Sequence, residues 1–421
     1  MRPGDLPAWN TGAGAGVNQG ETARAGRSGQ ARITLRRPKT KRMYIRPDYE
    51  TARAQAGFSW SAGGTQGALR ALTETPIRDF NLKPAALIDC YRRGRPLLRE
   101  MFGEDVSLPG LTTPAISYGH VNGLGSELLF PEGGEVAHTH IYASLEEGIR
   151  RLQEPVDYAT AGMAPFFLDF RRQIQEAFPG ENVGFAYGAE GPITTCYELR
   201  GEPFFTDIFD KPELAVRFLE LVTDSIVDFH RFIVEVHGGG KMPNPSGAGM
   251  VDDLSSFIPP RLFGSLVIPA WERYYSALTT GKRSAHIENL KAEQLPYLEE
   301  IGLSFYDPSI STALHPKIVS GACRVPFLWR LGSFHYREMS EQDVEDFVYQ
   351  SCADGASSVV TYVEESLCTE IGVRKVHAFI RAGKEAARLV KEGCSREEIG
   401  KRVSPAGKAK LWDGWGGYKG L

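Results

Sequence analysis

The stretch AHIENLKAEQLPYLEEIGLSFYDP (285–308) is typical of a strand, a helix and a second strand in quick succession. Its two strands would be SAHIE (284–288) and LSFYD (303–307). Side chains two residues apart on a strand point to the same face of the sheet. His286 and Glu288 are therefore expected to lie side by side, as two metal ligands or an acid and a base would.

The same alternation continues on both sides of this stretch. Three further apolar runs suit buried strands, namely VGFAYGA (183–189), RVPFLW (324–329) and SSVVTYV (357–363). Amphipathic helices lie between such runs; the longest covers residues 210–236 and opens with Asp210 and Glu213, a pair that resembles a capping box. Two more helices are expected to begin at Ser144 and Ser340. Strands that alternate with helices indicate parallel β/α units, so the sequence predicts an α/β fold, a single (β/α)8 TIM barrel.

Composition limits what the protein can do. The 421 residues carry a formal net charge of −4, which gives no basic footprint for nucleic acid or for an anionic membrane. Apolar runs are too short and too often interrupted by charge to span a bilayer. The 6 cysteines are scattered without a CxxC pair, which favours a reducing, cytoplasmic location over a disulfide framework.

The chain divides into three parts. Residues 1–42 are basic, rich in glycine and without apolar periodicity, so they are predicted to form a disordered tail. Met43 is an alternative start of the protein. The barrel is expected over residues 43–400. Residues 401–421 form an aromatic C-terminal tail with Trp412 and Trp415, which is expected to dock on the barrel or on a partner.

Polar side chains follow several of the predicted strands. Asp307 ends one strand, Glu364 and Glu365 follow another, and Asp252 and Asp253 follow a glycine-rich loop. Active sites of such barrels gather at the C-terminal ends of the strands. This repetition indicates an enzyme, with His286, Asp253 and Asp307 as its candidate catalytic residues.

Four segments in sequence order resemble the uroporphyrinogen decarboxylase superfamily, which also contains corrinoid-dependent methyltransferases. They resemble, in turn, its Gly-Pro-Phe-Thr segment, its acidic loop, its His-x-Cys strand and its Gly-Asn-x-Asp-Pro strand end. The segments are GPITTCYELRGEPFFTDIFDKPELAVRFLEL (191–221), VDDLSSFIPPRLFGSLVIP (251–269), AHIENLKAEQLPYLEEIGLSFYD (285–307) and RVPFLWRLGSFHYREMSEQDVEDFV (324–348).

The resemblance implies a zinc site with one substitution in its ligand set. Methyltransferases of this superfamily hold zinc with His-x-Cys and a later Cys. Here His286 keeps its place, Glu288 stands at the first Cys position, and the later position falls at Glu365, with Cys368 three residues on. A His/Glu/Glu set is a known catalytic zinc arrangement with one open coordination position. Oxygen ligands donate less charge than thiolates, which suits activation of an ether or amine leaving group.

The resemblance therefore implies a metal-dependent methyltransferase that moves a methyl group from a small methylated substrate to a corrinoid held by a partner protein. His335 and Tyr336, in a loop near the barrel mouth, are expected to contact the substrate. Two alternatives stay open. One is a metal-free carboxy-lyase for a tetrapyrrole or related acid, which would need arginines converging on the cleft; Arg92, Arg93 and Arg95 are its nearest candidates. The other is a tetrapyrrole-binding protein without catalytic activity.

A His-x-His pair, His138 and His140, raises a different possibility. On the first strand of a barrel, this pattern would indicate a metal-dependent amidohydrolase. The pair instead lies just before a predicted helix, where the superfamily resemblance implies an edge hairpin. Exposed polar alternation explains it better.

Overall fold

The structure is a computed structural model that describes residues 44–411. Its strands are β1 (Ser59–Gly64), β2 (Val106–Ser107), β3 (Leu128–Leu129), β4 (Ala137–His138), β5 (Gly247–Val251), β6 (Lys282–His286), β7 (Phe305–Asp307), β8 (Leu328–Leu331) and β9 (Ser358–Val363). The predicted basic tail, residues 1–42, and Met43 lie outside the described residues. No helix within 44–411 has the length and apolar character needed to cross a bilayer.

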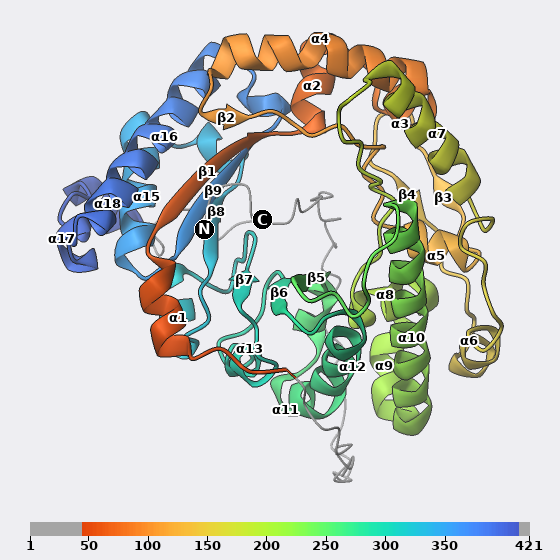
Figure 1. Cartoon of the computed structure of the whole chain (residues 1–421). Coiled ribbons are helices and arrows are strands. Elements are labelled where there is room, and N and C mark those ends of the chain that lie inside the picture. The colour runs from red at the N-terminus through yellow and green to blue at the C-terminus, as the bar shows by residue number, and fades with distance from the viewer. Residues whose placement is uncertain (1–43, 412–421) are drawn as a thin grey trace.

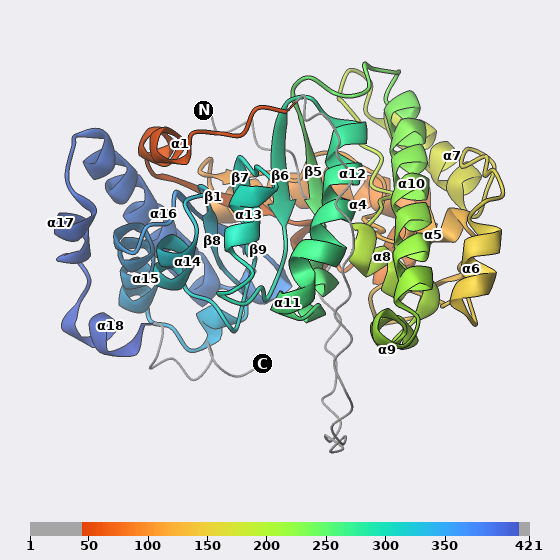
Figure 2. The same cartoon turned by 90° about the horizontal axis from the view of Figure 1, so that it is seen from below.

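Helices separate most of these strands. They are α1 (Tyr49–Ala56), α2 (Gln66–Thr73), α3 (Ile77–Leu82), α4 (Pro84–Phe102), α5 (Gly119–Gly123), α6 (Leu145–Arg151), α7 (Ala164–Ala177), α8 (Pro192–Arg200), α9 (Pro203–Asp210), α10 (Pro212–Val236), α11 (Pro260–Leu262), α12 (Ile268–Leu278), α13 (Pro296–Glu300), α14 (Pro316–Ala322), α15 (Glu341–Ala353), α16 (Glu370–Lys391), α17 (Arg396–Gly400) and α18 (Pro405–Lys410). Figure 1 shows strands β1 and β5 to β9 around a common centre, with α4, α10, α12, α15 and α16 outside them. Seen from below, α12 runs beside β5 and α10 packs on the outer side of α12 (Figure 2).

The strands of the second half are parallel neighbours in the predicted order. One sheet has the order β5-β6-β7 and another the order β2-β1-β9-β8, and every pairing in both is parallel. A single parallel bridge between Tyr306 and Phe327 connects the two sheets. The α/β class and the strand order are thus confirmed, but the described strands do not form one closed hydrogen-bonded ring.

The predicted strand 183–189 shows why the ring is interrupted. This segment makes only isolated parallel bridges, Thr112 to Gly184 and Ile116 to Tyr187. The amide of Ala186 donates to the hydroxyl of Thr113 at 2.8 Å, so a side chain replaces a backbone ladder bond. Pro114 stands between the bridges and has no amide hydrogen to donate. Prediction of a regular strand here was wrong for this reason.

The ends of several elements follow capping chemistry. As predicted, the Ser144 hydroxyl accepts from the amide of Glu147 at the start of α6, and Ser340 forms a capping box with Asp343 at the start of α15. The predicted cap at Asp210 is wrong, because α9 runs through Asp210 and α10 begins at Pro212 with no side-chain cap. The predicted strand 324–329 begins later, at Leu328, after a proline at 326 that cannot donate to a ladder.

Both ends of the described chain are attached to the body of the protein. Tyr44 donates its hydroxyl to the carbonyl of Gly302 at 2.8 Å, and its ring lies 4.2 Å from the guanidinium of Arg283. At the other end, α18 packs on α15, where the Lys410 ammonium donates to the Asp343 carboxylate at 2.9 Å. Residues 401–411, assigned to the aromatic tail by sequence, therefore include a docked helix. Trp412 and Trp415 lie outside the described residues.

Candidate metal centre

The C-terminal ends of three neighbouring strands meet at one level. The register pairs Val251 of β5 with His286 of β6, and His286 with Asp307 of β7. Beyond these ends, the chain enters a short 3-10 helix, η1 (Asp253–Phe257), after β5 and a turn after β6. Because parallel strands end at the same edge, side chains from three segments come within reach of one another.

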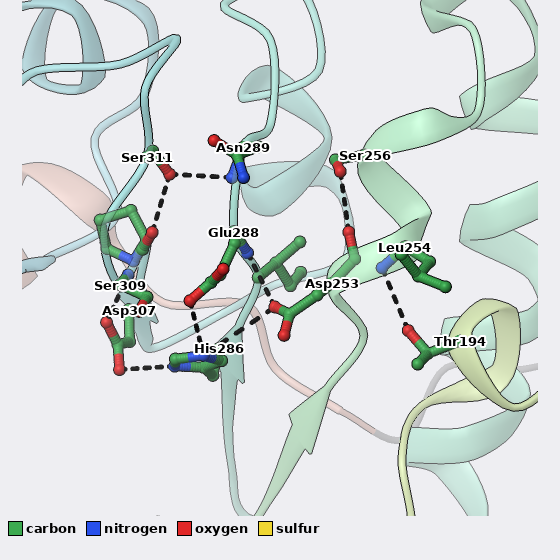
Figure 3. Close-up of polar contacts among 12 residues, drawn as sticks. Thr194, Asp253, Leu254, Ser256, His286, Glu288, Asn289, Asp307, Ser309 and Ser311 are labelled. Carbon is green, nitrogen blue, oxygen red and sulfur yellow. Dashed lines mark hydrogen bonds and ion pairs between the residues drawn. The ribbon is translucent and has the colours of Figure 1, made fainter. Parts of the chain in front are cut away.

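Asp253, His286 and Glu288 form the one group in residues 44–411 whose ligand atoms are arranged for a metal ion, all within 4.8 Å of one another. The Nε2 atom of His286 lies 3.9 Å from Asp253 Oδ1 and 3.8 Å from Glu288 Oε1 (Figure 3). Ile287 between the two ligands is fully buried, and Glu288 returns to the side of His286, as the period of an extended chain requires. The Glu288 amide donates to Asp253 Oδ1 at 2.8 Å and joins the two segments.

Asp307 fixes the orientation of the His286 ring. Its Oδ2 accepts from Nδ1 of His286 at 2.7 Å, and its Oδ1 accepts from the amide of Ser309 at 2.7 Å. Arg330 of β8 donates to the same Oδ2 at 3.3 Å. With Nδ1 turned to a carboxylate, Nε2 is directed to Asp253 and Glu288. A carboxylate behind a metal-binding histidine is the usual arrangement in zinc sites.

The electrostatics of the cluster depend on burial and on close charges. Burial alone would lower the pKa of His286, but the ion pair and hydrogen bond with Asp307 outweigh it and raise this pKa to about 9. Burial raises the pKa of Asp253 to about 6, against the opposing pull of His286. The acidic group Asp307 shows the reverse balance: burial would raise its pKa, yet His286 and Arg330 hold it below the ordinary value.

Asp252, next to the cluster, has a supporting position. It is fully buried, its Oδ1 accepts from the amide of Thr194 at 2.8 Å and its Oδ2 from the indole of Trp271 at 2.6 Å. Thr194 in turn accepts from the amide of Leu254 at 3.1 Å (Figure 3). Helix α8 is thereby joined to η1, and these bonds place Asp253 opposite His286.

The structure does not bring Glu365 into the cluster. Glu365 is exposed at the start of the 3-10 helix η4 (Glu365–Leu367), and Cys368 donates its thiol to the carbonyl of Glu364 at 3.7 Å. The reason is strand order: β5 and β7 flank β6, whereas β9 pairs with β8 and β1. Asp253 thus stands with His286 and Glu288 where Glu365 was expected as the third ligand.

The expected substrate residues His335 and Tyr336 are both buried in a 3-10 helix, η3 (His335–Arg337), after β8. Tyr336 donates its hydroxyl to Thr361 at 2.9 Å, and Nδ1 of His335 accepts from the Gly332 amide at 3.2 Å. Neither residue is part of the metal-ligand group. Their contacts connect η3 to the β8–β9 pair.

The His-x-His pair lies on the hairpin that the resemblance implied. His138 is in β4, which pairs antiparallel with β3. The ring of His140 is held by the carbonyl of Glu198, 2.9 Å from Nδ1. Neither histidine belongs to the metal-ligand group, so the structure does not support an amidohydrolase site.

Two acids near the cluster, Glu190 and the buried Glu198, and one arginine were missed by the sequence reasoning. Burial and then Asp253 raise the pKa of Glu190 to about 8, and burial raises the pKa of Glu198 well above its ordinary value. Arg330 lies in the otherwise apolar strand β8. Arg330 could have been noticed in the sequence, because it is a single charge inside an apolar run. Glu190 and Glu198 have no such pattern around them.

Comparison with known proteins agrees with this geometry. Residues 117–314 match the model of the uroporphyrinogen decarboxylase (URO-D) family. The chain is therefore similar to the URO-D family over this segment, which is a little under half of its 421 residues. The matched URO-D region includes β5, β6 and β7 and all three residues of the metal-ligand cluster. No curated protein matches the chain in sequence.

A solved structure shares the fold of this chain. It is a methyltransferase from Methanosarcina mazei, superimposed with a TM-score of 0.57 at 17% sequence identity. The match covers 80% of this chain and 97% of the methyltransferase chain. At this identity the likeness shows the shared fold.

Proposed function

We propose that the protein is a cytoplasmic, metal-dependent methyltransferase built on the eight-stranded TIM barrel of the URO-D superfamily. It would move a methyl group from a small methylated substrate to the corrinoid of a partner protein. The observation that carries the proposal is the cluster of Asp253, His286 and Glu288 with Asp307 behind the histidine. The fold shared with a methyltransferase supports the same reading.

The cluster fits zinc by the chemistry of its donors. Imidazole nitrogens and carboxylate oxygens are both zinc ligands, and three protein ligands leave one coordination position open, as in catalytic zinc sites. Tetrahedral ligands at zinc bond lengths stand about 3.4 Å apart. The separations of 3.9 and 3.8 Å from His286 Nε2 to the two carboxylates are close to that spacing. A zinc ion held by these three residues would supply Lewis acidity to the leaving atom of the substrate.

The protein's own residues would then set up the transfer. Asp307 keeps His286 in the tautomer that presents Nε2, and Arg330 keeps Asp307 ionised. Glu190, with its pKa raised to about 8, is protonated at neutral pH and is the candidate proton donor to the leaving atom. The bond from methyl carbon to oxygen or nitrogen breaks, and the leaving atom keeps the electron pair and takes the proton. The chemistry that a reduced corrinoid on the partner protein would supply is the electron pair for the new bond to the methyl carbon.

The carboxy-lyase alternative needs several arginines at the site, and the candidates lie elsewhere. On α4, Arg92 donates to the carbonyl of Ala177, Arg93 pairs with Asp89 and Arg95 pairs with Glu181. A tetrapyrrole with many carboxylates gains nothing from arginines on an outer helix. These three arginines therefore do not support the carboxy-lyase alternative, and the proposal of methyl transfer rests on the cluster.

Metal analysis of the purified protein tests the proposal. We expect about one zinc per chain, and we expect His286→Ala and Asp253→Asn to lose it, since each leaves only two ligands. Glu365→Gln is the matched control: it removes the carboxylate first expected as a ligand and should retain the metal. Wild-type protein that is free of metal and still transfers methyl groups would refute the mechanism, as would zinc loss from Glu365→Gln alone.

A further inference from the structure

Arg330 is a buried cation beside the metal-ligand cluster. Its side chain is 9% exposed on β8, within hydrogen-bond distance of Asp307, and its guanidinium lies 5.0 Å from the ring centre of Tyr362. Arg330 and Tyr362 therefore face the same side of the β8–β9 pair as Asp307. The guanidinium is placed among the groups that would surround a substrate.

The hydrogen-bonding capacity of Arg330 is largely unused. A guanidinium has five N–H donors. Within the described chain, that of Arg330 makes one hydrogen bond, the 3.3 Å contact to Asp307, and its Nε is buried without a partner. Buried polar groups in native proteins are nearly always paired, so the missing partners call for an explanation.

Support of Asp307 does not account for the arginine. Asp307 already accepts two shorter bonds of 2.7 Å, from His286 and from the Ser309 amide. Arg283, which is also buried and whose Nε also lacks a partner, differs in its terminal nitrogens: the carboxylate of Glu272 accepts from both of them, at 2.9 and 3.1 Å. The terminal nitrogens of Arg330 lack a carboxylate of their own.

Strand β1, which pairs with β9, has small and polar side chains where it faces Tyr362. A side chain at Gly63 of β1 would meet the Ser107 hydroxyl at 3.1 Å and the Tyr362 ring at 3.7 Å, so Gly63 points to this side. Trp60 points the other way, because its ring packs against Gly383 of α16. Alternation along β1 then places Ser61 on the side of Gly63. The Ser107 hydroxyl already donates to the carbonyl of Ala62, whereas Ser61 offers a hydroxyl donor on the same side of the sheet as Tyr362.

We propose that Arg330 binds a carboxylate of the substrate. The methyl donor would thus be a small acid, a methyl ether or methylated amine that carries a carboxylate at a second position. A carboxylate matches the planar fork of a guanidinium and forms strong, charge-assisted bonds with it. A phosphate dianion fits less well, because the Asp307 carboxylate lies 3.3 Å from Arg330 and would repel its second charge. That the bound acid is the methyl donor rests on the proposed function.

Binding of matched acids and amides tests the inference without any turnover assay. Full-length protein is titrated in a calorimeter with methoxyacetate and 4-methoxybenzoate, and with the neutral methoxyacetamide and 4-methoxybenzamide. We expect at least one acid to bind about tenfold to a hundredfold more tightly than its amide, the range for hydrogen bonds to a charged group. Arg330→Met should abolish this preference while amide binding is kept, and Arg330→Lys should keep part of it. Arg283→Lys, the matched control, should leave the preference unchanged.

The outcomes separate this inference from the proposed function. Zinc content is measured on the same samples. Zinc-loaded wild type that binds acids no better than amides, or binds neither at millimolar concentration, overturns the role of Arg330 and leaves methyl transfer standing. An acid preference that survives Arg330→Met also overturns it. If Arg330 only positioned Asp307, the variants would lose zinc with no change in the ratio of acid to amide affinity. Metal-free protein that prefers acids through Arg330 would support this inference and refute the zinc mechanism.

Discussion

Zinc binding at the cluster should displace a proton from His286, and the structure sets the size of the effect. The pKa of His286 in the metal-free protein is raised to about 9, whereas zinc needs the neutral imidazole. Because pH 7 is two units below that pKa, removal of the proton from His286 costs about 2.7 kcal/mol, which lowers the zinc affinity about a hundredfold. Apparent zinc affinity should therefore rise about tenfold per pH unit between about pH 6.5 and about pH 8, with close to one proton released per zinc.

The assay is calorimetric titration of chelator-treated protein with zinc, in buffers of different ionisation enthalpy, which counts the protons released. Asp307→Asn is the informative variant, because it keeps the shape of the side chain and removes the charge that raises the His286 pKa. Loss of a carboxylate behind a histidine ligand weakens metal binding by about 10–100-fold. In the same variant the His286 pKa is lower, so a proton competes less with zinc, and this strengthens zinc binding by a similar factor at pH 7. We expect little change in affinity at pH 7 but a flatter dependence on pH. Zinc binding with no proton release and no pH dependence in the wild type would refute the assignment of His286 as a protonated ligand.

Two further predictions concern stability. In metal-free protein, the raised pKa of His286 contributes stability that is fully present below its ordinary pKa of 6.5 and is lost as the pH rises through about 9. The free energy of unfolding should therefore fall by about 3 kcal/mol over that range. Denaturant melts at several pH values measure this fall, and a rise in stability would contradict the ion pair with Asp307. Removal of the residues before Met43 should leave the melting temperature unchanged. Tyr44→Ala, in contrast, should lower the free energy of unfolding by about 1–3 kcal/mol, because it removes the hydroxyl bond to Gly302 and the ring beside Arg283. Equal melting temperatures for the full-length and Tyr44→Ala proteins would contradict a stabilising role of Tyr44.

Local pattern was sufficient for part of the site. His286 and Glu288 could be placed together from the sequence because one residue separates them at a strand end, and the side-chain period there is two. The same reasoning placed Asp307 at the end of the next strand, where the register puts it beside His286. It failed for the segment 183–189, where Pro114 and the hydroxyl of Thr113 replace a regular ladder with isolated bridges. The residue pattern of one segment does not show which residues its partner strand offers for hydrogen bonding.

The sequence by itself determined the α/β alternation, the order of the second-half strands and two members of the metal-ligand cluster. These properties depend on hydrophobic periodicity and on neighbours in the chain. Only the tertiary structure decided the third member, because Asp253, Glu365 and Cys368 all follow strands and differ in which strand lies next to β6. It also decided the surroundings of Arg330, where one strand supplies the charge and others supply Asp307 and Tyr362. Contacts between segments far apart in sequence arise from packing and register, and these exist only once the sheet has formed.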